Sequence, residues 1–314
     1  MADETVHPVT PVEKRKRFQS LKAFLSNGKA RVGLVIFVFF LLMAIFAPVV
    51  SPYDPNDTNF AQLAAPSARH WLGTTGSGQD VLSQLIWGAR TSLTVGILAG
   101  VLSTAVAVLI GMYPGYRGGW IDNVLDTVTN IFMVIPSMPL IIVIASYIHS
   151  SGPYELVFVI GLTGWAGGAR VLRSQALTYR NRDFVVAAKL SGASELGILF
   201  GEILPNMLSL IIHVLMGGII GGIMSEAFLE FLGLGNSSVI SWGTMMYWAD
   251  AGGAMLMGAW WWLLPGGLAI AVVGMSMALM NYGIDQVTNP RLNTASKKKT
   301  RKSPKPGGVE IVEP

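Results

Sequence analysis

The chain has 314 residues, of which 52% are hydrophobic and only 13% are charged. So few charged residues cannot cover a soluble surface of that size, which excludes an ordinary soluble globular protein. Cysteine is absent, so a disulfide framework, thiolate chemistry and a cysteine-ligated metal are excluded as well. The sequence pI is about 9.3, but the basic residues cluster beside apolar runs. This placement indicates membrane topology rather than a nucleic-acid partner.

Apolar runs of membrane-spanning character recur along the chain. We expect six spans, at residues 32–50, 92–113, 124–148, 156–171, 207–224 and 260–280. The first run follows a basic lead, as the core of a signal peptide does, but the long lead and the further spans favour a membrane anchor. Pro136 and Pro139 lie in the third run and predict a kink, which is either a simple bend or a gate hinge. The sequence therefore predicts an all-α polytopic membrane protein with six transmembrane helices.

Basic residues predict the orientation of these spans. Of the 22 Lys and Arg residues, 20 fall in segments that six spans place on one side, and only Arg69 and Arg90 fall on the other. Because cytoplasmic loops are enriched in Lys and Arg, we expect both termini in the cytoplasm. Residues 51–90, rich in Pro, Asp, Gly and Thr, then form an outside segment with turns.

The segment 184–206 mixes charged with apolar residues between two membrane runs. Ala188 and Gly192 lie four apart, so on a helix they would share a nearly bare face. Gly192 can end a short helix in a left-handed cap, and Ser194 can start the next one. Pro205 suits the first turn of the following span. These features fit either an ordinary loop helix or a surface on which another protein docks.

This segment resembles the cytoplasmic coupling loop of ABC importer permeases, whose pattern is Glu-Ala-Ala, three residues, Gly, and later Ile-Leu-Pro. Val186 occupies the acidic position of that pattern. The resemblance implies the type I importer permease fold and a short helix that docks on an ATPase subunit. The residues it implies for coupling are Ala187, Ala188, Lys189, Ser191, Gly192, Ala193, Leu204 and Pro205.

Two further segments resemble the dipeptide and oligopeptide permease subfamily. The first runs over residues 70–93, where Thr75 and Gln79 replace an acidic and a basic residue of the subfamily pattern. The second begins at Glu226 and continues through Phe231-Leu232-Gly233-Leu234-Gly235 to residue 243. We expect residues 226–258 to form a short outer-face or re-entrant helix near the outer mouth, or else a plain interfacial helix.

The resemblance also implies partners. These are a second homologous permease, two ABC ATPase subunits, an extracytoplasmic substrate-binding protein and the lipid of a prokaryotic inner membrane, with no nucleic acid. ATP and Mg would be bound by the ATPase subunits, with no cofactor in this chain. A Walker A pattern is absent from the sequence, so we expect a transport subunit rather than an enzyme.

The expected organisation has four parts. These are a cytoplasmic N-terminal segment (1–31), a first span with its outside segment (32–91), a permease core (92–292) that contains the coupling loop (173–206), and a cytoplasmic tail (293–314). The tail is rich in Lys, Pro and Gly, a composition that predicts little stable structure.

Irregular backbone within a bilayer is tolerated only where it is surrounded by protein or water. We therefore expect the translocation path beside the proline-bearing third span and the glycine-rich fourth and fifth spans. We expect it to be lined by small or weakly polar groups, namely Asn130, Ser137, Ser146, Thr163 and His213. His213 could equally bond a neighbouring helix. In the fifth run Gly217 with Gly221, and Gly218 with Gly222, have the spacing of close helix packing, which is the alternative to a path.

Other functions stay open. Importers of this subfamily also move nickel, glutathione or oligosaccharides, so the cargo is not determined by these motifs. A secondary transporter would need ionisable groups within its spans, and His213 is almost the only candidate. A membrane enzyme would need a catalytic cluster, and none stands out.

Overall fold

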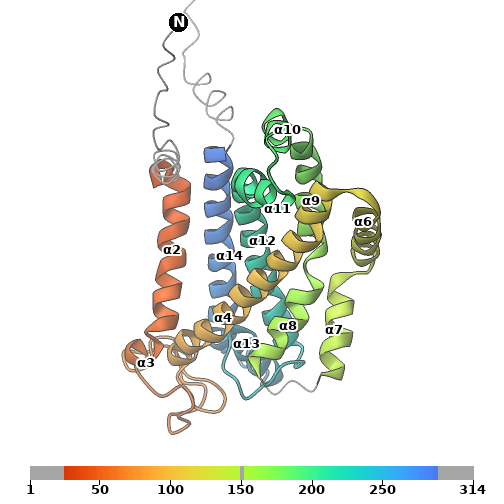
Figure 1. Cartoon of the computed structure of the whole chain (residues 1–314). Coiled ribbons are helices and arrows are strands. Elements are labelled where there is room, and N and C mark those ends of the chain that lie inside the picture. The colour runs from red at the N-terminus through yellow and green to blue at the C-terminus, as the bar shows by residue number, and fades with distance from the viewer. Residues whose placement is uncertain (1–24, 149–151, 289–314) are drawn as a thin grey trace, which may run out of the picture.

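The computed structural model describes residues 25–148 and 152–288, and its regular structure is helical apart from one isolated β-bridge between Thr74 and Asp80. The all-α prediction is therefore confirmed (Figure 1). The helices are α2 Gly28–Ile45, α3 Ala47–Val50, α4 Val81–Ala107, η1 Val108–Met112, α5 Tyr113–Arg117, α6 Gly119–Val134, α7 Ser137–Tyr147, α8 Pro153–Thr163, α9 Ala166–Arg180, α10 Asp183–Leu190, α11 Glu195–Ile198, η2 Leu199–Ile203, α12 Leu204–Phe231, α13 Trp242–Ala251 and α14 Trp260–Thr288.

Four stretches are long and apolar enough to cross a membrane: Gly28–Ile45, Val81–Arg117, Glu195–Phe231 and Trp260–Ile284. Two bent helix pairs, α6 with α7 and α8 with α9, meet the same criteria only as pairs. If each pair is one span, the described residues contain six, which is the predicted number.

The third and fourth spans are not single helices; a kink was predicted in the third, whereas the bend in the fourth was not predicted. The third is broken by an 87° bend between α6 and α7. Pro136 disfavours helical geometry in the residue before it, and Ile135 is accordingly extended with ψ 123°. Pro139 lies in the first turn of α7, where a proline is tolerated. The fourth span bends by 42° between α8 and α9, after Gly164 ends α8.

Two other boundaries differ from the prediction. Helix α4 begins at Val81 rather than residue 92, because the Asp80 side chain caps it by accepting a hydrogen bond from the Ser83 N–H. Helix α12 continues past residue 224 to Phe231. Glu226 and Glu230, expected in an outer-face element, therefore lie in the last turns of a membrane-spanning helix.

Helices α4 and α12 pack closely along their glycines. A Cβ atom added to Gly222 would lie 2.8 Å from the Gly96 carbonyl oxygen, and one added to Gly100 would lie 2.6 Å from the Ile219 nitrogen. Such distances are shorter than real contacts, so only glycine lets the two backbones approach this far. Gly218, which faces Gly100, completes the seam.

Two of the four long apolar stretches, Val81–Arg117 and Glu195–Phe231, contain a π-helical turn that ends two residues before a proline. Segment η1 ends at Met112 and is followed by Pro114, whereas η2 ends at Ile203 and is followed by Pro205. A proline ring clashes with the carbonyl of the residue four earlier in a continuous α-helix. The wider π turn relieves that clash, so both helices continue across their prolines.

The molecule has two distinct ends (Figure 1). Helices α10 and α11 lie at one end, together with the start of α2 and the end of α14. The turn-rich segment 51–80, helix α3 and helix α13 lie at the other. The predicted tail 293–314 and most of the predicted N-terminal segment 1–31 lie outside the described residues.

Buried polar side chains hold segment 51–80 together. Asp80 is 1% exposed; its carboxylate is 2.9 Å from His70 Nδ1 and accepts hydrogen bonds from the Ser83 N–H and hydroxyl, each 2.8 Å long. The buried Thr74 hydroxyl donates to the Ala61 carbonyl at 2.6 Å. Thr75 and Gln79, the two departures from the subfamily pattern, bond to each other's backbone or side chain, with Gln79 N–H donating to Thr75 Oγ1 at 3.0 Å. The buried side chains of His70, Thr74 and Asp80 are thus paired within the chain.

Candidate functional site

The first candidate site is the coupling segment, which we define as residues 183–203, from α10 through η2. The predicted order of helix, glycine turn and second helix is confirmed. Helix α10 ends at Leu190, Gly192 adopts a left-handed φ of +77°, and the Ser194 hydroxyl caps α11 by accepting a bond from the Gly197 N–H at 3.1 Å. Pro205 lies in the first turn of α12, as predicted.

One local prediction is wrong. Ala188 and Gly192 do not share a helical face, because the helix has ended before Gly192. The segment is also shorter than the expected loop 173–206, since α9 stays helical to Arg180 and α12 begins at Leu204.

The inner side of the coupling segment is anchored to the helix bundle. Val185, Ile198 and Ile203 are at most 1% exposed and belong to one buried cluster with Met112 and Ala176 of the neighbouring helices. The Lys189 ammonium lies 5.3 Å from the centre of the Tyr116 ring, within cation–π range. The segment is therefore a rigid projection of the bundle rather than a loose loop.

The outer side of the coupling segment is bare. Ala187, Ser191, Gly192 and Ala193 are exposed, whereas Ala188 and Leu204 are half-buried and Pro205 is exposed. The large apolar residues here are also uncovered: Leu190 is 85% exposed, and Val186, Leu196 and Phe200 are 45%, 58% and 60% exposed. Gathered apolar side chains at a solvent-facing end mark an interaction surface. Val186, which replaces the acidic family residue, thus adds to an apolar surface.

The second candidate site is a cavity of about 380 Å³ between α4, α7, α8, α9 and α12. Two of the predicted path residues, Ser137 and His213, line it together with Ser103. Gly217 and Gly221 also line it, and a Cβ added to either would meet no atom within 4 Å. One glycine pair of α12 therefore faces open space while the other, Gly218 with Gly222, packs on α4.

The other three predicted path residues lie elsewhere. The Asn130 side chain accepts a hydrogen bond from the Arg170 guanidinium. The Ser146 and Thr163 hydroxyls donate to carbonyls four residues earlier in their own helices, Ile142 and Val159, at 2.7 Å each. The structure thus brings Ser137 and His213 to one cavity, but not these three.

Reading the sequence missed a buried carboxylate pair. Glu226 is fully buried and Glu230 is 2% exposed, one turn apart on α12. Glu226 accepts a 3.1 Å hydrogen bond from the Ser92 hydroxyl of α4, and Ser241, the N-cap of α13, donates to Glu230. The pair joins α4, α12 and α13 at the end opposite the coupling segment. Their four-residue spacing places both glutamates on one face of a helix, but the predicted span 207–224 stops before them.

A further ion cluster joins α6 to α9. The Arg173 guanidinium bonds both oxygens of Asp122, at 2.6 and 2.9 Å, and lies 3.1 Å from Asp126. Asp122 is 6% exposed, so its carboxylate depends on this partner. The cluster fixes the bent third span against the helix that leads into the coupling segment.

A helical bundle with several stretches long and apolar enough to cross a membrane defines a polytopic membrane protein. The chain belongs to the binding-protein-dependent transport system inner membrane components, whose family model matches residues 107–292. Residues 18–66 match the N-terminal TM domain of oligopeptide transport permease C. It is therefore an ABC importer permease, a multi-pass inner-membrane protein of the type I fold.

Named relatives agree with this assignment. The oligopeptide transport system permease protein OppC of Bacillus subtilis is 33% identical over 86% of this chain and 88% of its own length. The dipeptide transport system permease protein DppC of the same organism is 32% identical over 85% of this chain and 83% of its own length. OppC of Mycobacterium bovis is 31% identical over 82% and 89%.

Proposed function

We propose that this chain is the permease subunit that forms half of the path for dipeptides or oligopeptides in an ATP-driven importer. The observation that carries the coupling role is the coupling segment, which is anchored by Val185, Ile198 and Ile203 on one side and bare on the other. The peptide cargo is supported by relatives named as oligopeptide and dipeptide permeases.

The proposed partners fit the surfaces of the chain. The bare side of the coupling segment receives an ABC ATPase subunit, which binds ATP and Mg, so this chain itself is a transport subunit and not an enzyme. The cavity with Ser137 and His213 is one half of a path that a second, homologous permease completes. A binding protein delivers cargo at the opposite end, around segment 51–80 and α13.

Coupling runs through one continuous element. Helix α11, η2 and α12 follow one another without a break from Glu195 to Phe231. The same stretch carries the exposed Leu196 at the docking surface and Gly217 and Gly221 at the cavity. Because its backbone is helical throughout, a displacement imposed by the ATPase moves the cavity wall.

A substitution at the docking surface tests this function. Gly192→Trp should abolish ATP-dependent peptide uptake and uncouple ATP hydrolysis, because a bulky side chain blocks docking and the left-handed backbone at φ +77° is strained without glycine. Membrane insertion should be unchanged. Uptake of a radiolabelled tripeptide into cells measures transport, and ATPase activity of the purified complex measures coupling.

The matched control is Gly28→Trp. Gly28 lies at the same end of the molecule, at the start of α2, and a Cβ there also meets no atom within 4 Å. Transport should be retained in this variant. Normal uptake by Gly192→Trp would contradict the docking role, and competition of uptake by nickel, glutathione or an oligosaccharide rather than by peptides would contradict the cargo.

Orientation is tested by labelling. We propose that both termini and the coupling segment are cytoplasmic, and the cysteine-free chain permits single reporters. In intact cells, Ser51→Cys and Ser237→Cys should react with an impermeant maleimide, whereas Ser191→Cys on the exposed end of α10 should not. If residue 191 alone reacted, the coupling segment would lie outside the cell and the proposed orientation would be wrong.

A further inference from the structure

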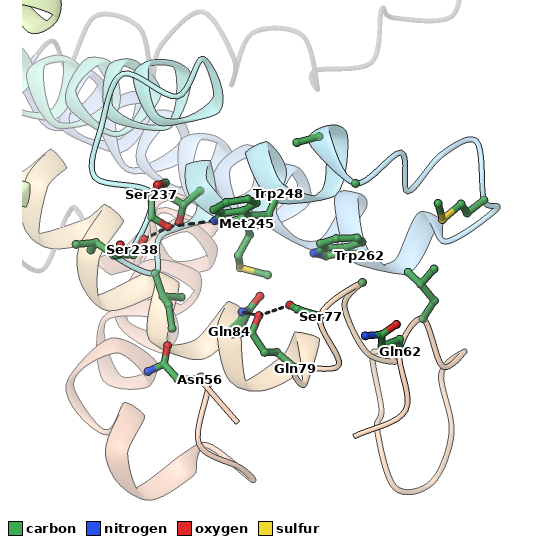
Figure 2. A pocket seen from close by; sticks show the side chains of 18 residues that line it. Asn56, Gln62, Ser77, Gln79, Gln84, Ser237, Ser238, Met245, Trp248 and Trp262 are labelled. Atoms are coloured by element: carbon green, nitrogen blue, oxygen red, sulfur yellow. Dashed lines mark hydrogen bonds between the residues drawn. The ribbon is translucent and has the colours of Figure 1, made fainter. Parts of the chain in front are cut away.

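A pocket opens at the end opposite the coupling segment, between segment 51–80, the loop before α13, and α13 itself (Figure 2). Its volume is about 810 Å³, within the range of small-molecule sites. Its side chains come from parts of the chain far apart in sequence, from Asn56 to Trp262. A Cβ added to Gly76 or Gly252 would lie 2.8 Å from the Trp262 ring, so close backbone packing fixes this ring in the pocket wall.

The pocket is neutral. None of the 18 residues that line it is Asp, Glu, Lys, Arg or His. A charged group placed inside would leave water without meeting a counter-charge, which is costly. The lining therefore selects an uncharged ligand, or the uncharged part of a larger one.

Several polar groups in the wall have unused hydrogen-bonding capacity. The Gln79 side-chain oxygen accepts bonds from the Ser77 hydroxyl and the Gln84 amide, each 2.9 Å long, which leaves the Gln79 amide group as a free donor within the described residues. The side chains of Asn56 and Gln62 make no hydrogen bond in the described part of the chain. Ser77, Gln79 and Gln84 gather on one side of the opening in Figure 2.

The strongest indication of a ligand is the Trp262 indole. Trp262 is 5% exposed, and its Nε1 donor is buried without an acceptor among the described residues. Figure 2 shows the nitrogen-bearing edge of this ring turned toward the interior of the pocket. Buried indole N–H groups normally have a partner, so a ligand acceptor such as a carbonyl oxygen would complete it.

We propose that this pocket binds an uncharged stretch of extended peptide main chain, namely the interior of the incoming cargo. Carboxamides offer both a donor and an acceptor, as a peptide unit does, and the indole N–H offers a donor for a peptide carbonyl. Met245, Trp248 and Met257 add an apolar wall that adapts to varied side chains. Recognition of the main chain is independent of side-chain identity. This inference rests on the peptide cargo proposed above.

The test uses the assembled importer in lipid nanodiscs, without ATP and without binding protein. Ser238→Cys, an exposed position in the wall, is the only cysteine of this chain and reports occupancy by its rate of reaction with a maleimide. The probe is N-acetyl-pentaalanine amide, which has no charged terminus. Saturating probe should slow the reaction about fivefold or more, and uncapped pentaalanine should protect less well.

Removal of the indole donor tests the proposed contact. Trp262→Phe should raise the half-protecting concentration about tenfold, the effect of losing one hydrogen bond to a buried partner. Trp260→Phe is the matched control, because Trp260 is 53% exposed and lies outside the pocket; it should leave protection unchanged. Gln62→Ala, at an exposed side chain, should weaken protection a few fold without affecting the fold.

The inference is overturned by any of four results. These are no protection by the capped peptide, equal protection by a neutral disaccharide, no change in Trp262→Phe and Gln62→Ala, or protection only after the binding protein is added. Uptake of the same capped peptide by the intact importer separates the two proposals. If uptake occurs while the pocket fails these tests, the peptide function stands and the pocket assignment falls.

Discussion

Segment 51–80 and the coupling segment lie at opposite ends of the molecule. They differ in whether their side chains are buried and paired within the chain. In segment 51–80 the polar groups of His70, Thr74 and Asp80 are buried and bonded within the chain, although the segment has no helix. In the coupling segment most residues are helical, yet Leu190 and Phe200 are exposed to solvent. Regular secondary structure therefore does not indicate where buried polar side chains are paired within the chain.

The difference separates intrinsic stability from function in a complex. An internally bonded segment should lose stability when one partner is removed, because a buried polar group is then left unpaired. Substitution of an exposed apolar side chain should instead weaken binding to a partner, because burial of that side chain in the complex favours association. Substitutions in the two regions should therefore change different quantities, stability in the first and affinity for a partner in the second.

The largest effect on stability is expected at Asp80. Asp80→Ala removes the cap of α4 and the buried carboxylate bonded to His70 and Ser83, which should lower the free energy of unfolding by about 3–4 kcal/mol. Chemical unfolding in mixed micelles, followed by tryptophan fluorescence, measures the change. Asp54→Ala is the control, since Asp54 is exposed and its side chain bonds only the Asn56 N–H among the described residues. Equal losses in both variants would contradict the network.

A smaller loss is expected at the seam between α4 and α12. Gly222→Leu forces a side chain against the Gly96 backbone, 2.8 Å from its carbonyl oxygen, and should destabilise the chain by about 2–3 kcal/mol. Gly221→Leu, one residue earlier, points into the cavity where no atom lies within 4 Å. It should keep the stability and slow transport of long peptides more than short ones. If Gly221→Leu lowered the stability and Gly222→Leu did not, Gly221 rather than Gly222 would be the residue that packs on α4.

A still smaller loss is expected in the ion cluster between α6 and α9. Arg173→Ala leaves the buried Asp122 without its partner and should cost about 2 kcal/mol, because the cluster is partly open to solvent. Arg117→Ala removes a pair with Glu195 that is 3.9 Å long and well exposed, and should cost less than about 0.5 kcal/mol. Thermal unfolding of the two purified variants distinguishes them.

The sequence predicted what depends on local chemistry. The six apolar runs, the helix–glycine–helix order around Gly192 and the capping by Ser194 all follow from residues close in the chain. The 87° break at Pro136 was expected only as a kink, because a proline ends a helix or bends it according to what packs around it. Local composition cannot supply that packing.

What escaped prediction depends on contacts between distant residues. The burial of Glu226 and Glu230 depends on hydrogen bonds from Ser92 and Ser241, which lie on other elements of the chain. Gly217 with Gly221 has the same spacing as Gly218 with Gly222, and the position of α4 alone decides which pair packs. Of the five side chains expected at the path, only Ser137 and His213 line the cavity, and this too depends on how distant helices pack.

The smallest effect on stability, and the clearest on assembly, is expected at Leu190. This side chain is 85% exposed on the coupling segment, so Leu190→Ser removes almost no contact within the chain and should change the free energy of unfolding by less than about 0.5 kcal/mol. If the ATPase covers Leu190, the substitution should instead weaken ATPase binding about tenfold, the effect of losing part of one buried leucine. Binding of the purified ATPase subunit to the permease pair in nanodiscs measures this.

The control for that measurement is Leu256→Ser at the opposite end. Leu256 is 95% exposed in the loop between α13 and α14, so the chemical change and the solvent exposure match those at Leu190. It should change neither the unfolding nor the affinity for the ATPase. Because the two variants differ only in the end of the molecule they alter, a tenfold loss at Leu190 alone assigns the docking surface to the coupling segment. Equal affinities for both variants would remove Leu190 from that surface.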